Sequence, residues 1–223
     1  MKPTIITVAD GEAAGREAAG RVAAAIADAL AERGVAHVAL AGGTTPRRAY
    51  ALVGPLVPDW SAVHLWFGDE RCVGADDPDA NVRMVRESLE APGAILHRIE
   101  GELGAEAAAE QYALLLGDTV LDLALLGLGE DGHTASLFPD NAGLDATGVA
   151  VGVHGAPKPP PDRVSLTLDK LNEARAILLL TEGAGKREAM RGLLGRPTTH
   201  VPSSLLDRSK LTVVADAAAV PED

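Results

Sequence analysis

The sequence predicts an α/β fold in which a mainly parallel sheet is covered by helices on both faces. Short apolar runs alternate with segments of helical period along the whole chain. Several of these runs carry no polar residue, which is typical of strands buried on both faces of a parallel sheet. No repeat or long linker divides the 223 residues. We therefore expect residues 1–223 to form a single, doubly wound, Rossmann-like domain.

The elements follow from the spacing of apolar residues and from the residues that end each run. Strands are expected at residues 4–8, 35–41, 63–67, 121–128, 149–153, 163–168, 176–181 and 211–215. An alanine-rich helix is expected to be capped by Asp10, to run through Arg33 and to stop at Gly34. Shorter helices are expected at residues 46–53, 79–90, 105–116 and 184–194.

Composition and charge exclude several classes of protein. The formal charge is −12 and no cluster of Lys and Arg occurs, so the basic stripe that a nucleic-acid surface needs is missing. A few local cations can still bind a small anion, because salt screens distant charges over roughly 8 Å. Asp10 and Glu12 come too early for a signal peptide, and the single Cys72 cannot form an internal disulfide, so we expect a cytoplasmic protein.

The segment AGGTTPR, residues 41–47, connects a predicted strand to a predicted helix. Gly42 and Gly43 let the backbone approach a ligand, Thr45 can cap the helix, and Pro46 suits its first position. Free amides at a helix start, with the hydroxyls of Thr44 and Thr45 beside them, can hold a phosphate. The alternative is a plain, well-capped turn without a ligand.

Two further loops follow predicted strands. FGDERC, residues 67–72, places Asp69, Glu70 and Arg71 after a strand, either as part of a site or as a solvated loop. GLGEDGHT, residues 127–134, matches the dinucleotide pattern G-x-G-x-x-G, but Pro139 follows too soon for a crossover helix, and we reject that interpretation. His133 is a candidate general base, because an imidazole can accept and return a proton near neutral pH. The alternative is a histidine bonded to its own loop.

Taken together, these loops with DDPDAN, LGLGEDGHTASLFP, PKPPPDRVSLTL and TEGAGKREA resemble the 6-phosphogluconolactonase family. The similarity covers about residues 38–190 in the family's order. It implies a sheet fold shared with glucosamine-6-phosphate deaminase and no metal or organic cofactor. It also implies the hydrolysis of 6-phosphogluconolactone in the oxidative pentose phosphate pathway, with a phosphosugar lactone as the only expected partner apart from weak self-association.

The resemblance implies roles for individual residues. His133 would draw a proton from the water that attacks the lactone carbonyl, and Asp131 would orient or tune it. Gly42, Gly43, Thr44 and Thr45 would hold the phosphate. The cations expected around the phosphate or the developing oxyanion are Arg71, Lys158, Arg163 and Lys186. Asp69 is a candidate substrate-binding residue, whereas an ion pair with Arg71 is the simpler interpretation of Glu70.

Two rival functions are weaker. The related deaminase carries a motif that resembles GHIAFNEP, with a carboxylate before the proline, whereas GHTASLFP places Phe138 there, and an apolar ring cannot shuttle a proton. A sugar-phosphate-sensing regulator would need a DNA-binding segment, which residues 1–34 do not offer. No metal site is expected, because the six histidines are scattered and only one cysteine is present.

Overall fold

The computed structural model describes residues 2–222 and is built around a seven-stranded parallel sheet in the order β1-β10-β9-β6-β2-β3-β5. Its strands are β1 (Thr4–Val8), β2 (Ala36–Leu40), β3 (Val63–Phe67), β5 (Ile95–Leu96), β6 (Leu123–Gly127), β9 (Ala176–Thr181) and β10 (Leu211–Asp216). A second sheet is antiparallel and contains β4 (Asp69–Arg71), β8 (Arg163–Leu166) and β7 (Ala150–Val153). The predicted α/β class is confirmed, and the small second sheet is an addition to it.

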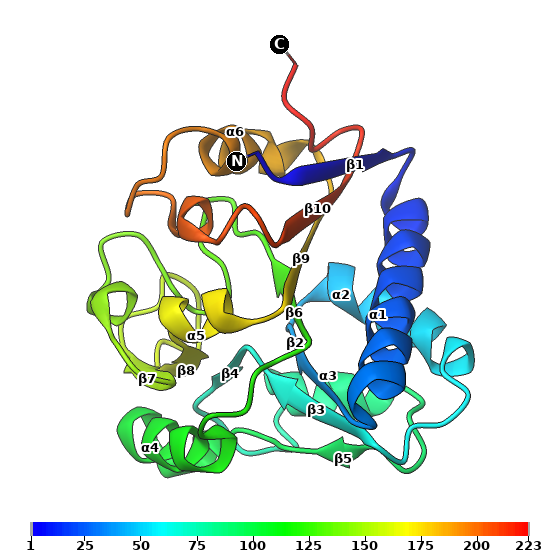
Figure 1. The fold of residues 1–223 in the computed structure, drawn as a ribbon. Coiled ribbons are helices and arrows are strands. Elements are labelled where there is room, and N and C mark those ends of the chain that lie inside the picture. Colours follow the sequence, from blue (N-terminus) through cyan, green and yellow to red (C-terminus); the bar gives the residue numbers. More distant parts are fainter. Residues whose placement is uncertain (1, 223) are drawn as a thin grey trace.

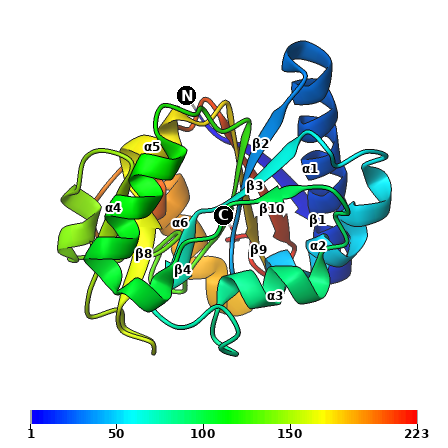
Figure 2. The same ribbon diagram turned by 90° about the horizontal axis from the view of Figure 1, so that it is seen from below.

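Helices cover both sides of the large sheet (Figures 1 and 2). They are α1 (Gly11–Arg33), α2 (Thr44–Val53), α3 (Asn81–Ser88), α4 (Ala105–Leu116), α5 (Leu168–Glu173) and α6 (Arg187–Leu194). Single turns of 3-10 helix are η1 (Gly54–Leu56), η2 (Gly101–Leu103), η3 (Ala142–Asp145), η4 (Ala184–Lys186) and η5 (Pro202–Leu205). α1 and α2 pack on one side, whereas α4 packs against the small sheet on the other.

The long first helix has the ends that the sequence predicts. The side chain of Asp10 accepts a hydrogen bond from the N–H of Ala13, and Gly34 ends the helix in the left-handed conformation. Its buried face is mostly alanine, with Val22 and Ile26 as the larger residues. Small side chains let the helix lie close to the sheet.

Other elements differ from the prediction for identifiable reasons. β4 consists of three charged residues and β5 of only two residues, so neither shows an apolar run. The predicted helix at residues 184–194 is divided into η4 and α6. α2 begins at Thr44 with Gly43 as its N-cap and no side-chain cap, so the expected cap by Thr45 is wrong. Pro46 is therefore the third residue of the helix, where its missing N–H still needs no intrahelical acceptor.

The winding of the sheet reverses between its neighbouring strands β2 and β6. From β2 the chain moves through α2 to β3 on one side, and from β6 it proceeds to β9 on the other. At such a reversal the two connections leave the carboxyl ends in opposite directions and leave a crevice between them. The loops after β2, β6 and β9 meet there.

Both tyrosines of the protein secure strand ends beside this crevice. The Tyr50 hydroxyl donates to the carbonyl of Ala41 (2.8 Å) and accepts from its N–H (2.9 Å). The Tyr112 hydroxyl accepts from the N–H of Phe67 (2.7 Å) and donates to its carbonyl (3.1 Å). Both side chains are buried, and burial raises the pKa of each phenol, which keeps the hydroxyl a donor. Each tyrosine thus satisfies both backbone groups of one residue where the chain enters a site loop.

We expect Tyr50→Phe and Tyr112→Phe each to lower the free energy of unfolding by about 1–3 kcal/mol, because a buried N–H and a carbonyl lose their partner. Urea unfolding of each variant measures the change. An unchanged denaturation midpoint in both variants would contradict the anchoring role.

Candidate active site

A cavity of about 450 Å³ lies at the carboxyl ends of the central strands. The predicted site residues that line it are Gly42, Gly43, Thr44, Thr45, Asp69, Arg71, His133, Lys158 and Lys186. They come from loops that are far apart in sequence and from β4 of the small sheet. The volume is that of a pocket for a small metabolite.

The glycine-rich loop forms one wall of the cavity. Because no side chain caps α2, the N–H groups of Thr44 and Thr45 have no intrahelical acceptor and are available to an anion. The Thr45 hydroxyl donates to Oε1 of Glu182 (3.1 Å), whose other oxygen accepts from Arg48 (2.6 Å). Glu182 follows β9 and also lines the cavity, so it links this strand to the start of α2.

The charges of FGDERC are separated by the alternation of strand β4. Asp69 and Arg71 line the cavity, whereas Glu70 points the other way and is 2% exposed. Glu70 accepts hydrogen bonds from the backbone N–H groups of Arg71, Asn81 and Val82 (2.8, 2.7 and 2.8 Å). The expected ion pair between Glu70 and Arg71 is therefore wrong, because the carboxylate holds the start of α3 instead. The solvated-loop alternative is also wrong, since Asp69 and Glu70 are buried.

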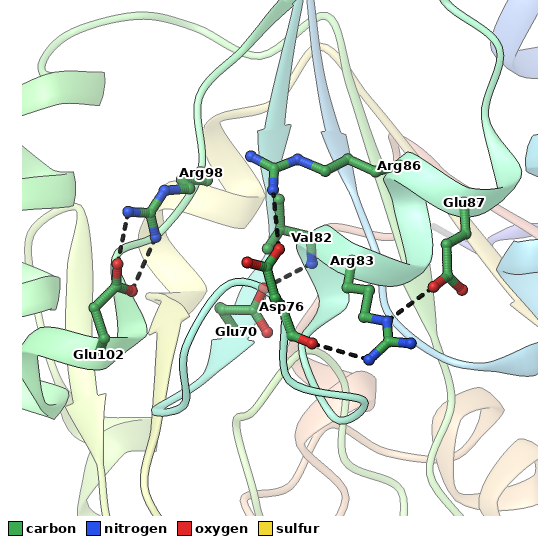
Figure 3. Close-up of polar contacts among 8 residues, drawn as sticks. All are labelled: Glu70, Asp76, Val82, Arg83, Arg86, Glu87, Arg98 and Glu102. Carbon is green, nitrogen blue, oxygen red and sulfur yellow. Dashed lines mark hydrogen bonds and ion pairs between the residues drawn. The ribbon is translucent and has the colours of Figure 1, made fainter.

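The segment between β4 and α3 is tied down from α3, as Figure 3 shows. The guanidinium of Arg83 donates to the carbonyl of Asp76 (2.9 Å) and pairs with Glu87 (2.8 Å). Arg86 lies 4.0 Å from the Asp76 carboxylate. Arg71 donates to the carbonyl of Asp79 (2.5 Å) at the end of the same segment, which fixes the direction of its side chain.

His133 and Asp131 form a close pair in the loop after β6. Nδ1 of His133 lies 2.5 Å from Oδ1 of Asp131, which leaves Nε2 as the free ring nitrogen. Burial opposes ionisation of Asp131, but the hydrogen bond and charge of His133 outweigh it and lower the pKa of the carboxyl to about 2. A Cβ at Gly129 would lie 2.0 Å from Nδ1, so only glycine admits the imidazole here. The Phe138 ring packs 4.6 Å from the imidazole, centroid to centroid.

Of the remaining predicted cations, the two lysines line the cavity and Arg163 does not. Lys158 is exposed at the rim of the cavity, and Lys186 is half-buried. Burial lowers the pKa of Lys186, Glu130 opposes this change, and Lys158 adds to it. Arg163 lies outside the cavity lining and donates to the carbonyls of Lys158 and Pro160 (2.9 Å each). Its guanidinium therefore supports the loop that carries Lys158.

The cavity also contains residues for which the sequence suggested no role. The polar ones are Asn81, Glu130, Thr181 and Glu182. Thr181 and Glu182 stand at the carboxyl end of a strand that the sequence predicted, so position alone could have indicated them. Asn81 belongs to the DDPDAN segment of the resemblance, but nothing in its local sequence indicates that α3 brings it to Asp69.

Two absences hold for residues 2–222. No group of three or more His, Cys, Asp or Glu side chains is placed to hold a metal ion. In the same range, no helix combines the length and apolar character needed to cross a membrane.

A parallel α/β sheet with a polar cavity at the carboxyl ends of its strands is typical of α/β enzymes. Comparison with known proteins assigns this chain to a family. Residues 9–215 match the model of the glucosamine-6-phosphate isomerases/6-phosphogluconolactonase family, and the chain belongs to that family. A 6-phosphogluconolactonase of Streptomyces coelicolor is 34% identical, with 99% of this chain and 94% of the relative covered. The crystal structure of a 6-phosphogluconolactonase from Shewanella baltica has a TM-score of 0.89 at 28% identity, covering 97% of this chain and 98% of the other.

A monomeric glucosamine-6-phosphate deaminase has a TM-score of 0.83 at 22% identity, with 97% of this chain and 98% of the other covered. This likeness extends the shared fold to the deaminases. The fold is thus common to both branches of the family, and the choice between their chemistries depends on side chains in the site.

We expect Glu70 to make stability depend on pH. Burial raises the pKa of Glu70 to about 7 from its ordinary 4.5, although three backbone N–H groups oppose the rise. The folded protein therefore binds more protons than the unfolded chain between these values. This contribution to the free energy of unfolding is fully present below pH 4.5 and is lost as the pH rises through about 7.

Urea unfolding from pH 4 to 8 measures this dependence. Glu70→Gln should flatten the profile between about pH 4.5 and 7, whereas Glu110→Gln, an exposed position on α4, should leave it unchanged. Identical profiles for Glu70→Gln and the parent protein would refute the assignment.

Proposed function

We propose that this protein is a 6-phosphogluconolactonase, which hydrolyses 6-phospho-D-glucono-1,5-lactone to 6-phosphogluconate in the pentose phosphate pathway. The observation that carries the proposal is the position of His133, held by Asp131, in the same cavity as an uncapped helix start that suits a phosphate. The lactonase relatives in the family support it. A lactone is an activated ester, so an oriented base and charge stabilisation suffice without a nucleophilic side chain.

In the proposed mechanism, Nε2 of His133 takes a proton from water while the water oxygen bonds to the lactone carbonyl carbon. Asp131 accepts a hydrogen bond from the Nδ1–H of His133, which fixes the tautomer and stabilises the imidazolium. The tetrahedral intermediate then collapses and the bond from the carbonyl carbon to the ring oxygen breaks. The imidazolium returns the proton to that oxygen, which becomes a hydroxyl of the open product.

The remaining residues bind and stabilise charge. The amides of Gly42, Gly43, Thr44 and Thr45 and the hydroxyls of Thr44 and Thr45 hold the phosphate at the positive end of α2. For this contact the Thr45 hydroxyl turns its proton from Glu182 to a phosphate oxygen. Arg71, Lys158 and Lys186 provide positive charge for the phosphate and the developing oxyanion. Arg163 acts through the backbone of the loop that carries Lys158.

The proposal extends to the setting of the enzyme. We propose a single catalytic domain over residues 1–223, which acts in the cytoplasm as a monomer or weak homo-oligomer. Its partner is the small phosphosugar lactone alone. It uses no metal or organic cofactor and binds no nucleic acid, for which the charge of −12 is unsuited.

The deaminase alternative is disfavoured by the surroundings of His133. Phe138 packs on the imidazole at the position where the deaminase-type motif has a carboxylate. No proton can be relayed through a phenyl ring. A sensing domain would bind the same ligand without turnover, so activity separates it from the enzyme.

Acid release from freshly prepared 6-phosphogluconolactone, with the spontaneous rate subtracted, tests the proposal directly. We expect rapid release with the purified protein and no ammonia from glucosamine 6-phosphate. Ligand binding without acceleration would favour the sensing domain, and ammonia release would favour the deaminase.

We expect His133→Ala to lower kcat by roughly 10²- to 10⁴-fold, because the general base is lost. His154→Ala is a matched control, since His154 also contacts a carboxylate (Asp162, 2.8 Å) but lies outside the cavity lining. Circular dichroism confirms folding of both variants. Near-normal turnover of His133→Ala would rule out the imidazole as base.

We expect the phosphate to be required for efficient hydrolysis. Glucono-1,5-lactone without phosphate should show a kcat/KM at least about 100-fold lower, because several hydrogen bonds to a charged group are lost. Thr45→Val should reduce the difference in kcat/KM between the two lactones, because one hydroxyl contact to the phosphate is lost. Thr147→Val, at an exposed position, should leave this difference unchanged. Equal kcat/KM values for the two lactones would contradict the assignment of residues 42–45 as a phosphate-binding loop.

We expect full activity after exhaustive treatment with EDTA, since the proposed steps need only water, His133 and local cations. Initial rates before and after treatment give the comparison. If activity disappears and returns with magnesium, manganese or zinc, a metal-activated water replaces the histidine mechanism.

A further inference from the structure

The carboxylate of Asp69 is held from two sides at the wall of the cavity. Its Oδ2 accepts a hydrogen bond from the hydroxyl of Ser136 (2.7 Å). Asn81 Nδ2 lies 3.4 Å from Oδ1 and donates to the backbone carbonyl of Asp69 (2.8 Å). All three residues are at least nine-tenths buried. The orientation of the carboxylate is therefore fixed before any ligand enters.

Ser136 cannot contact a ligand in the cavity itself. It is 0% exposed and lies behind the lining, to which its neighbour Ala135 belongs. Its N–H donates to the hydroxyl of Ser165 (3.3 Å), and Ser165 stands opposite Asp69 in the β4–β8 pairing. The small sheet thus places the Ser136 hydroxyl toward Asp69.

A carboxylate accepts hydrogen bonds only, and a sugar lactone offers several hydroxyl donors. Asp69 stands beside Arg71 in the cavity, with Oδ1 less firmly engaged than Oδ2. We propose that Ser136 is a positioning residue that orients Asp69 to accept a hydrogen bond from a hydroxyl of the lactone. The inference rests on the proposed function and adds a specificity determinant to it.

The test is a comparison of Ser136→Ala with Ser203→Ala. Ser203 is equally buried, and its hydroxyl has no hydrogen-bond partner within residues 2–222. With fresh 6-phosphogluconolactone, Ser136→Ala should lower kcat/KM by about 10- to 100-fold. The change should lie mainly in KM, because the hydroxyl contact exists in the ground state and the transition state alike. Ser203→Ala should stay within about twofold of the parent protein.

A mutant cycle separates positioning from a general loss of structure. In an Asp69→Asn background, Ser136→Ala should lower kcat/KM by no more than about a further twofold, because the carboxylate that Ser136 orients is already absent. If Ser136→Ala lowers kcat/KM equally in the parent protein and in Asp69→Asn, the inference is overturned. A Ser136→Ala variant with the KM of the parent protein would also overturn it. If the alanine variant does not fold, Ser136→Cys, which keeps the volume and has a weaker donor, takes its place with the same expectations.

Failure of the proposed function gives a different result from failure of this inference. If the parent protein does not accelerate lactone hydrolysis, the proposed function fails. The same cycle is then measured as Kd for 6-phosphogluconate by calorimetry, where Ser136→Ala should weaken binding only when Asp69 is intact. If the parent is active and the cycle shows no coupling, the inference alone is refuted.

Discussion

The site depends on how the central strands end. A parallel ladder leaves backbone groups unpaired where the chain turns away, and in an apolar core each such group carries a cost. Here the hydroxyls of Tyr50 and Tyr112 pair with Ala41 and Phe67, so that each phenol acts as a substitute for a neighbouring strand. The glycine-rich loop and β4 leave the sheet in fixed directions as a result.

Local pairing reconciles an acidic protein with an anionic ligand. Three carboxylates near the cavity have their own donors: Glu182 has Thr45 and Arg48, Asp131 has His133, and Asp69 has Ser136. By contrast, Arg71, Lys158 and Lys186 form no ion pair within the described chain and keep their charge available. Because salt screens charges that lie farther away than the Debye length, these nearby cations affect the binding of a phosphate more than the net charge of the protein does.

The sequence allowed the large sheet and most of the site to be predicted, because strand ends and glycine-rich loops leave local signals. Nine of the predicted site residues line one cavity, with His133 against Asp131 as expected. The small sheet and the direction of Glu70 were not predictable in this way. β4 is too short and too charged to show a strand pattern. Glu70 accepts hydrogen bonds from the N–H groups of Asn81 and Val82 only because packing brings the start of α3 to β4.

The candidate site spans two sheets. Its histidine and glycine loops leave the large sheet, whereas Asp69 and Arg71 belong to the small one, and Gly68 alone separates β3 from β4. Gly68 is itself paired on both sides, because its N–H donates to the carbonyl of Leu40 (2.9 Å) and its carbonyl accepts from the N–H of Leu166 (2.8 Å). The two sheets therefore form one continuous frame across the cavity, and a substitution that shifts either sheet would move both walls of the site together.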